Sequence, residues 1–157
     1  MHILLTNDDG VRAQGLQILK RELAACGHRL TIAAPNGQRS AASHSMSINK
    51  PLYCREMAQD DTQIREIAIS GTPVDCVKMA MEYFLVKDRP QLLISGINNG
   101  YNLGSDVLYS GTVSAAMEGP YYQIPAIAAS MYPMDADRCV QTARLIQQLI
   151  EKVIVKG

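Results

Sequence analysis

Short apolar runs alternate along the chain with segments of helical spacing. Residues 2–6 are mostly apolar, which predicts a strand buried on both faces. From about residue 12 the pattern becomes helical, and Gly27 supplies an end for this helix. A second buried strand is predicted over 30–34, ended by Pro35. The buried face of the helix between them is marked by Leu16, Leu19 and Leu23. A strand, a helix and a strand in this order predict parallel pairing.

The rest of the chain continues the alternation. Thr72 and Pro73 are typical of a helix start, with Thr as N-cap and Pro at the first helical position. The other strands are expected over 53–57, 64–69, 92–94 and 124–129. The other helices are expected from Gly111 to Gly119-Pro120 and along Ala143, Ile146, Ile150 and Val153. The pattern therefore predicts an α/β fold: a three-layer α/β/α, Rossmann-like single domain over 1–157 with a mostly parallel sheet.

Charge and hydropathy exclude several partners. Fifteen basic residues balance fifteen acidic ones, so no basic field is expected to hold a nucleic-acid polymer. No apolar run approaches the roughly 20 residues needed to cross a bilayer, so no membrane partner is expected. No basic segment precedes the first apolar run, which argues against a signal peptide. A cytoplasmic location is predicted.

The cysteines do not form a spaced motif. No two of them have the separation of a zinc knuckle or a redox pair. In a reduced compartment all four are expected to be small core residues: Cys26, Cys54, Cys76 and Cys139.

The most informative chemistry follows the first strand. Asp8 and Asp9 are adjacent carboxylates directly after a buried run. Two ionised carboxylates so close together favour a cation between them, and oxygen ligands select Mg²⁺ or Mn²⁺. The alternative is that one of them caps the helix that begins near Val11. Ligands of open α/β sheets bind beyond the carboxyl ends of the strands, where this pair is expected.

Other polar clusters fall at the same edge of the sheet. The loop 39–45 offers Ser40 as a metal or phosphate ligand, or as ordinary loop filler, and His44 as an acid, a base or a bystander. The stretch 95–104 is rich in Gly and Asn, and its amides are neutral ligands for a metal or phosphate. Ser110-Gly111-Thr112 opens a helix, whose free N–H groups form an anion site. Ser110 or Thr112 could equally be an N-cap.

Taken together, these motifs make the sequence resemble the SurE (survival protein E) family of metal-dependent nucleotidases. The resemblance covers most of residues 1–130, in order and at the family's spacing. It is carried by ILLTNDDGV at 3–11, APNGQRSAAS at 34–43, SGTPVDCV at 70–77, SGINNGYNLGSDVLYSGTVSAAMEG at 95–119 and IPAIAAS at 124–130.

The resemblance implies a site and an activity. It implies one divalent metal ion, Mg²⁺ or Mn²⁺, held by Asp8, Asp9, Ser40 and Asn98. The phosphate would be bound by Asn98, Ser110, Gly111 and Thr112, and the catalytic residues would be Asp8 and Asp9. The implied reaction is hydrolysis of nucleoside 5′- and 3′-monophosphates, with short polyphosphate as a further substrate. The bound metal would activate the attacking water. Asp8, Asp9 and water are all candidates for the general acid that protonates the leaving group.

Two departures from the family pattern define the rival interpretation. Ala13-Gln14-Gly15 stands where members usually carry Ala-Pro-Gly, and members run roughly a hundred residues further. At that length a homodimer or homotetramer is implied. The alternative is therefore a nucleotide- or phosphate-binding fragment with little turnover, which would expose apolar surface and self-associate. A haloacid-dehalogenase-type phosphatase is set aside, because Asp8 is followed directly by Asp9 rather than by D-x-D.

Overall fold

The computed structural model describes residues 1–154. Val155 lies outside them, so the expectation of exposed apolar surface at the end of the chain stays a prediction. A six-stranded sheet forms the middle layer, in the order β3-β4-β2-β1-β5-β6. Its strands are β1 (His2–Thr6), β2 (Arg29–Pro35), β3 (Cys54–Met57), β4 (Ile64–Ile69), β5 (Leu92–Asn99) and β6 (Ala126–Met131). All neighbours pair in parallel except β3, which runs antiparallel to β4 at one edge.

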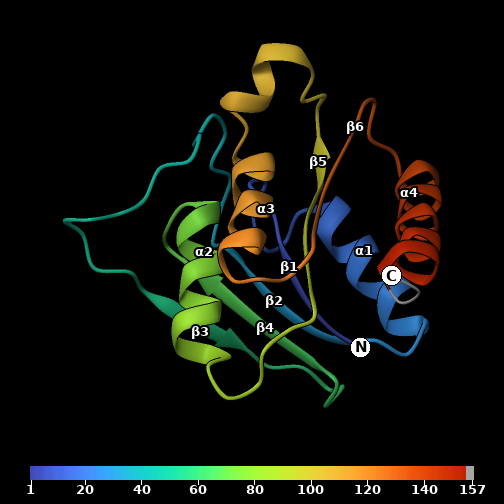
Figure 1. The fold of residues 1–157 in the computed structure, drawn as a ribbon, viewed down its shortest axis with the longest axis horizontal. Coiled ribbons are helices and arrows are strands. Elements are labelled where there is room, and N and C mark those ends of the chain that lie inside the picture. The colour runs from blue at the N-terminus through green and yellow to red at the C-terminus, as the bar shows by residue number, and fades with distance from the viewer. Residues whose placement is uncertain (155–157) are drawn as a thin grey trace.

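Helices cover both faces of the sheet, as the hydrophobic pattern predicts (Figure 1). One layer contains α1 (Gln14–Ala25) and α4 (Ala136–Leu149), and α4 ends in the π-helical turn η3 (Ile150–Ile154). The other contains α2 (Pro73–Met79), which continues as the π-helical turn η1 (Ala80–Phe84), and α3 (Gly111–Tyr121). A short 3-10 turn, η2 (Gly104–Leu108), connects β5 to α3. The three-layer prediction is confirmed.

The alternation of β1 explains why the sheet has two hydrophobic cores. All five of its residues are buried. Ile3 and Leu5 pack in the core beneath α1 and α4, whereas Leu4 packs in the core beneath α2 and α3. A strand covered by helices on both faces gains from apolar side chains at every position, so its run is continuous. The same reasoning applies to β2 apart from Thr31, whose buried hydroxyl lies 2.9 Å from Nε2 of His2.

Several element boundaries differ from the prediction. β5 extends to Asn99, because the chain resumes pairing with β6 at Asn98 after a bulge that follows Ser95. α3 passes through Pro120 and ends at Tyr121. Pro120 supplies no N–H, and the helix ends one residue later, where the Tyr122 N–H bonds to the carbonyls of Glu118 and Gly119 at 3.3 and 3.0 Å.

The expectation for the cysteines is half wrong. Cys76 and Cys139 are buried, but Cys26 and Cys54 are exposed. Cys26 is exposed because it lies at the C-terminal end of α1, where the helix leaves the core. Cys54 is exposed because it lies on the edge strand β3, which has a neighbour on one side only.

The topology creates one switch point. From β1 the chain proceeds outward to β2 and β4, then returns to β5 on the other side of β1. Loops that leave β1 and β5 therefore diverge at their carboxyl ends, and such a crevice is where ligands bind in open α/β sheets. Within residues 1–154, no helix has both the length and the apolar character needed to cross a membrane.

Candidate functional site

The loop after β1 is held in a tight turn by Asn7. This side chain is fully buried, and its amide N donates to the carbonyl of Gly10 at 3.0 Å while its oxygen accepts from the Gly10 N–H at 3.1 Å. Gly10 has φ +106°, and a Cβ there would lie 3.1 Å from the backbone of Gly37. Sequence reasoning gave Asn7 no role, although an Asn three residues before a Gly is a signal for such a turn. The turn presents Asp8 and Asp9 at the switch point.

Each aspartate is oriented by a donor from another element. Asp8 is only 8% exposed, and the Thr112 hydroxyl donates to its Oδ1 at 2.6 Å. The Asn99 N–H donates to Oδ2 of Asp9 at 3.1 Å. Within the described chain, no side chain donates to the second oxygen of either carboxylate. Asp9 therefore keeps one oxygen for a ligand, and Asp8 keeps one that is free of side-chain donors, with the backbone N–H groups of Asp8 and Thr112 also near its carboxylate.

Burial governs the ionisation of Asp8. Desolvation raises the pKa of its carboxyl above the ordinary value, the Thr112 hydrogen bond opposes this, and the charge of Asp9 raises the pKa further. Asp8 is thus a buried carboxylate beside a second carboxylate, without a cationic side-chain partner in residues 1–154. A cation at this position would relieve both costs.

Asn98 reaches the same place through the irregular end of β5. Gly96 has φ +135°, and a Cβ there would lie 2.3 Å from the carbonyl oxygen of Ala129, so only glycine fits this approach to β6. After the bulge, the Asn98 amide N donates to the carbonyl of Gly100 at 3.0 Å. The Asn98 oxygen is left without a donor among the described residues.

Ser40 completes the predicted set from an exposed loop. The preceding N–H, of Arg39, donates to the carbonyl of Asp8 at 2.7 Å, which ties this loop to the β1 loop. Further along, Ala41 and Ser43 have φ of 53° and 50°. Together these segments enclose an open cavity of about 310 Å³, lined by Asp8, Asp9, Gln38, Ser40, Ala41, Asn98, Asn99, Tyr101, Asn102, Asp106, Tyr109 and Ser110. All four predicted metal ligands line it.

At the start of α3, Ser110 lines the cavity and Thr112 contacts Asp8. Ser110 is the N-cap, because its hydroxyl accepts from the Val113 N–H at 3.2 Å, and it also lines the cavity. Gly111 and Thr112 do not line the cavity; a Cβ on Gly111 would lie 3.0 Å from Cβ of Asp8, and Thr112 bonds to Asp8. The structure therefore brings Thr112 to Asp8 rather than to open space.

Neither aspartate caps α1, and His44 lies outside the cavity. The N-cap of α1 is Ala13, with no side-chain hydrogen bond, so neither Asp8 nor Asp9 caps that helix. His44 lies within 2.6 Å of Glu118 on α3 and does not line the cavity. Asp106, which does line it, was not singled out from the sequence; its position between the glycine-rich stretch and Ser110 was the available signal.

Only two of the four candidate metal ligands are carboxylates. No group of three His, Cys, Asp or Glu side chains suited to a metal occurs in the described part of the chain. The candidate set instead combines two carboxylates with one hydroxyl and one amide, all oxygen donors of the kind that hard divalent cations prefer.

The fold and the cavity define a doubly wound α/β protein with an all-oxygen candidate metal site at its switch point. Comparison with known proteins gives the family. The model of the family described as Survival protein SurE matches residues 3–157, and the chain belongs to that family.

Relatives and a solved structure agree with this assignment. The chain is 46% identical over 158 residues to the 5′-nucleotidase SurE of Caldanaerobacter subterraneus subsp. tengcongensis, covering 99% of this chain and 60% of that protein. It is 51% identical over 136 residues to the 5′-nucleotidase SurE of Desulfitobacterium hafniense, covering 87% and 53%. The crystal structure of SurE protein from Aquifex aeolicus superposes with a TM-score of 0.85 at 36% identity, covering 100% of this chain and 61% of that one. The chain thus spans about 60% of the length of the first relative.

Proposed function

We propose that this chain carries the metal centre of a phosphomonoesterase that hydrolyses nucleoside 5′- and 3′-monophosphates to nucleoside and phosphate, with short polyphosphate as a further substrate. The observation that carries the proposal is the convergence of oxygens on one cavity. Asp8, Asp9 and Asn98 each commit one polar atom to the protein and keep another free of side-chain donors. The relatives named 5′-nucleotidase support the choice of substrate.

The residues fit one divalent ion, Mg²⁺ or Mn²⁺. Asp8 and Asp9 would supply the negative charge, and Ser40 and Asn98 would supply neutral oxygens. When bound, the ion would polarise the phosphate and lower the pKa of a water that attacks phosphorus. The buried position of Asp8 supports this fit, since its carboxylate lacks a cationic partner among the described residues.

The protein's own groups would orient the reactants. Thr112 and the Asn99 N–H hold the two carboxylates in fixed directions, which lowers the cost of assembling the metal site. Ser110 lines the cavity at the start of α3, where no acidic residue occupies the first turn. The positive end of the helix would therefore stabilise an anionic phosphate bound by Asn98 and Ser110, with Gly111 and Thr112 contributing through their backbone N–H groups rather than through side chains. Asp8, Asp9 and water are the candidates for the general acid.

Phosphate release by the 157-residue chain tests the proposal. Adenosine 5′-monophosphate should be hydrolysed with Mn²⁺ or Mg²⁺, EDTA should stop hydrolysis, and added metal should restore it. Binding of the same nucleotide should be measured in parallel. Metal-dependent binding without phosphate release would instead identify a nucleotide-binding module with little turnover, and loss of both would contradict the metal assignment.

The proposal extends to location and assembly. A cytoplasmic protein that forms a homodimer or homotetramer at the length of its relatives is expected. Cell fractionation and light scattering measure these two properties directly.

A further inference from the structure

A second cavity is lined in part by the β1 loop and shares no lining residue with the cavity of the candidate metal ligands. It has a volume of about 430 Å³ and is lined by Val11, Arg12, Asn36, Tyr53, Cys54, Arg55, Met57 and Ala68. The alternation of β3 places Arg55 and Met57 on the face of the sheet that α1 covers further in, since Met57 packs with the core beneath α1. β3 is the edge strand, so this hollow lies beside α1 and opens to solvent.

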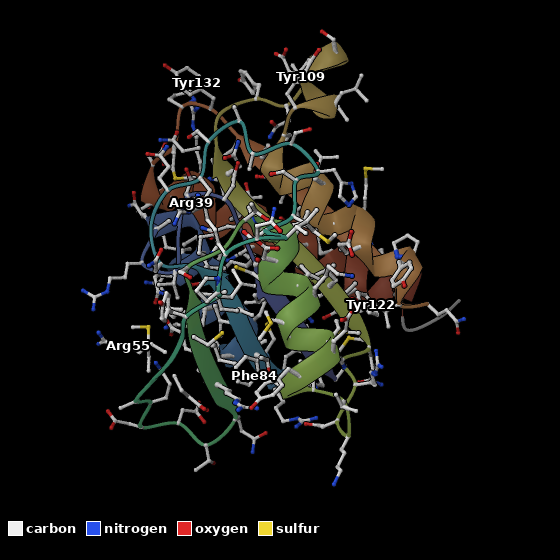
Figure 2. The ribbon with its side chains drawn as sticks, turned by 90° about the vertical axis from the view of Figure 1, so that its left-hand side faces the viewer. Arg39, Arg55, Phe84, Tyr109, Tyr122 and Tyr132 are labelled. Carbon is white, nitrogen blue, oxygen red and sulfur yellow. The ribbon has the colours of Figure 1, made fainter. Side chains whose placement is uncertain are left out.

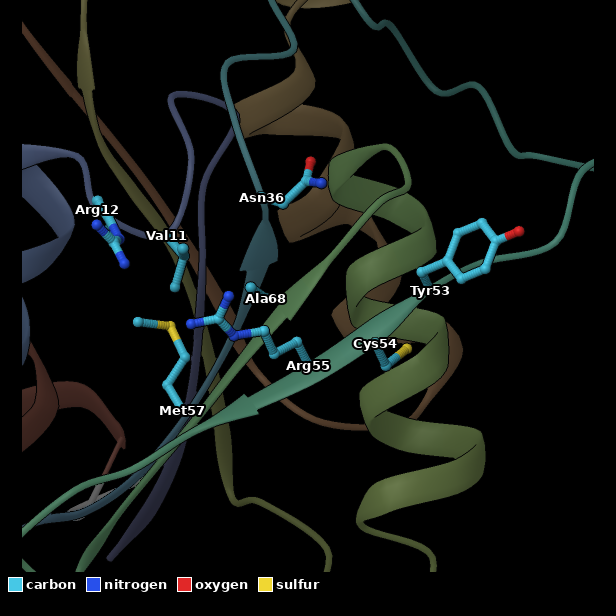
Figure 3. Close-up of a pocket in the computed structure, with 8 residues that line it drawn as sticks. All are labelled: Val11, Arg12, Asn36, Tyr53, Cys54, Arg55, Met57 and Ala68. Carbon is cyan, nitrogen blue, oxygen red and sulfur yellow. The ribbon is translucent and has the colours of Figure 1, made fainter.

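Two arginines reach into this cavity from separate elements. Arg12 comes from the turn before α1, and Arg55 comes from β3. Figure 3 shows both guanidinium groups extending toward the same space, near the thioether end of Met57. Neither forms a salt bridge or hydrogen bond within the described residues, whereas Arg29 pairs with Asp88, Arg65 with Glu56, and Arg138 with Asp135.

The carboxylates near this cavity are already engaged. Glu56 follows Arg55 directly, but it accepts from Arg65 at 2.8 Å. Glu66 lies two positions before Ala68 on β4, but it accepts from Lys20 at 2.9 Å, Gln17 at 3.2 Å and Gln59 at 3.1 Å. No acidic side chain lines the cavity itself. Two positive charges thus share one hollow without a compensating negative charge from residues 1–154.

We propose that this cavity binds a phosphate group of a small molecule, at a site separate from the candidate metal centre. Arg12 and Arg55 are exposed and water screens their mutual repulsion, but both line one hollow, so an anion bound there would meet two guanidinium groups at once. A guanidinium presents N–H donors in a fork that matches two phosphate oxygens. Asn36 adds an amide at the rim.

The two sites share loops but not ligands. The Val11 N–H donates to the carbonyl of Pro35 at 2.8 Å, and the Arg39 N–H donates to the carbonyl of Asp8 at 2.7 Å, so the β1 and β2 loops run side by side. Asp9 and Ser40 face one cavity, while Arg12 faces the other. In Figure 2, Tyr109, which lines the cavity of the candidate metal ligands, stands at the upper end of the molecule, and Arg55 of β3 lies lower.

The test is phosphate binding by the metal-free protein at constant ionic strength. Calorimetry in EDTA should detect binding of inorganic phosphate to the wild type. Arg12→Gln and Arg55→Gln should each weaken binding by at least about tenfold, because a hydrogen bond to a charged group contributes roughly 1.5–3 kcal/mol. Arg144→Gln is the matched control: it removes the same charge from an exposed position on α4 and should leave binding unchanged.

Three outcomes of these titrations would bear on the proposed phosphate site. Absence of phosphate binding by the folded wild type, or equal binding by the wild type and by both arginine variants, would overturn the proposal. An equal loss in Arg144→Gln would also overturn it, since the effect would then be one of net charge. Repeating the titration with adenosine 5′-monophosphate distinguishes a free phosphate from one that carries a nucleoside. Because no metal is present, failure here leaves the nucleotidase proposal untouched.

Discussion

Asp8 and Asp9 leave a strand at the centre of the sheet, whereas Ser40 lies in a long loop near its edge. Asp8 is buried and accepts from Thr112, and Asp9 accepts from the Asn99 N–H. The Ser40 side chain is exposed, and none of the described residues forms a hydrogen bond with its hydroxyl. One side of the candidate metal site is therefore built by the fold, while the other depends on the position of a loop.

The difference has a physical origin. Strands β1 and β5 are fixed by pairing on both sides and by helices on both faces, so their ends have few alternative positions. The Ser40 loop has backbone ties to the carbonyls of Asp8 and Tyr109, at 2.7 and 3.1 Å. Fixing a loop residue costs conformational entropy, and the loop's further ties, from Ser43 to the carbonyl of Leu108 and from His44 to Glu118, do not hold the Ser40 side chain itself. Substitutions on the central side should accordingly have larger effects than those on the loop side.

The largest effect is expected for Asp9→Asn. Asparagine keeps the shape and can still accept from the Asn99 N–H, but it removes the charge that would hold the metal. Loss of several kcal/mol of metal-derived stabilisation corresponds to at least about 100-fold in turnover. Phosphate release at saturating Mn²⁺ measures this. Asp106→Asn, in the same cavity but outside the proposed ligand set, is the control and should lose much less. Near-normal turnover of Asp9→Asn would remove Asp9 from the site.

Thr112→Val should have the next largest effect. Valine keeps the volume but removes the hydroxyl that donates to Asp8 at 2.6 Å. Loss of such a supporting contact typically weakens metal affinity by about 10–100-fold, which a Mn²⁺ titration measures. Thr112→Ser retains the hydroxyl and should restore affinity. If instead phosphate binding falls while metal affinity is kept, Thr112 acts on phosphate directly, as the family resemblance implies.

The contact between Thr112 and Asp8 also shows where sequence reasoning ends. The candidate ligands Asp8, Asp9 and Asn98 could be placed together because each follows an apolar run, and the ends of parallel strands meet at one edge. The Thr112 contact joins residues 104 positions apart. It depends on how α3 is placed across the sheet, which periodicity does not specify. The Gly-rich end of β5 was missed as a strand for a related reason, since its pairing with β6 is set by tertiary contacts.

Ser40→Ala should have a smaller effect, of about tenfold in Mn²⁺ affinity, because it removes one neutral ligand from the loop side. A net contribution near 1 kcal/mol is typical for a neutral polar contact. Ser105→Ala removes an exposed hydroxyl of η2 that has no hydrogen bond among the described residues and does not line the cavity, so it should leave affinity unchanged. A loss of 100-fold or more in the Mn²⁺ affinity of Ser40→Ala would mean that the Ser40 loop is as well fixed as the ends of β1 and β5. The proposed difference between the two sides of the site would then be wrong.

The smallest expected effect concerns stability without metal. Burial raises the pKa of Asp8, so the folded state disfavours its ionised form. In EDTA at neutral pH, Asp8→Asn removes that charge while keeping an acceptor for Thr112, and should stabilise the fold by about 1 kcal/mol. A raised folded pKa means that the wild type loses stability as pH rises through it. The gain should therefore shrink as pH falls, because the wild-type carboxyl then becomes neutral. Thermal unfolding at several pH values measures this, with the less buried Asp9→Asn as control. A metal-free Asp8→Asn that unfolds at a lower temperature than the wild type at neutral pH would show that the Thr112 contact outweighs the cost of burial.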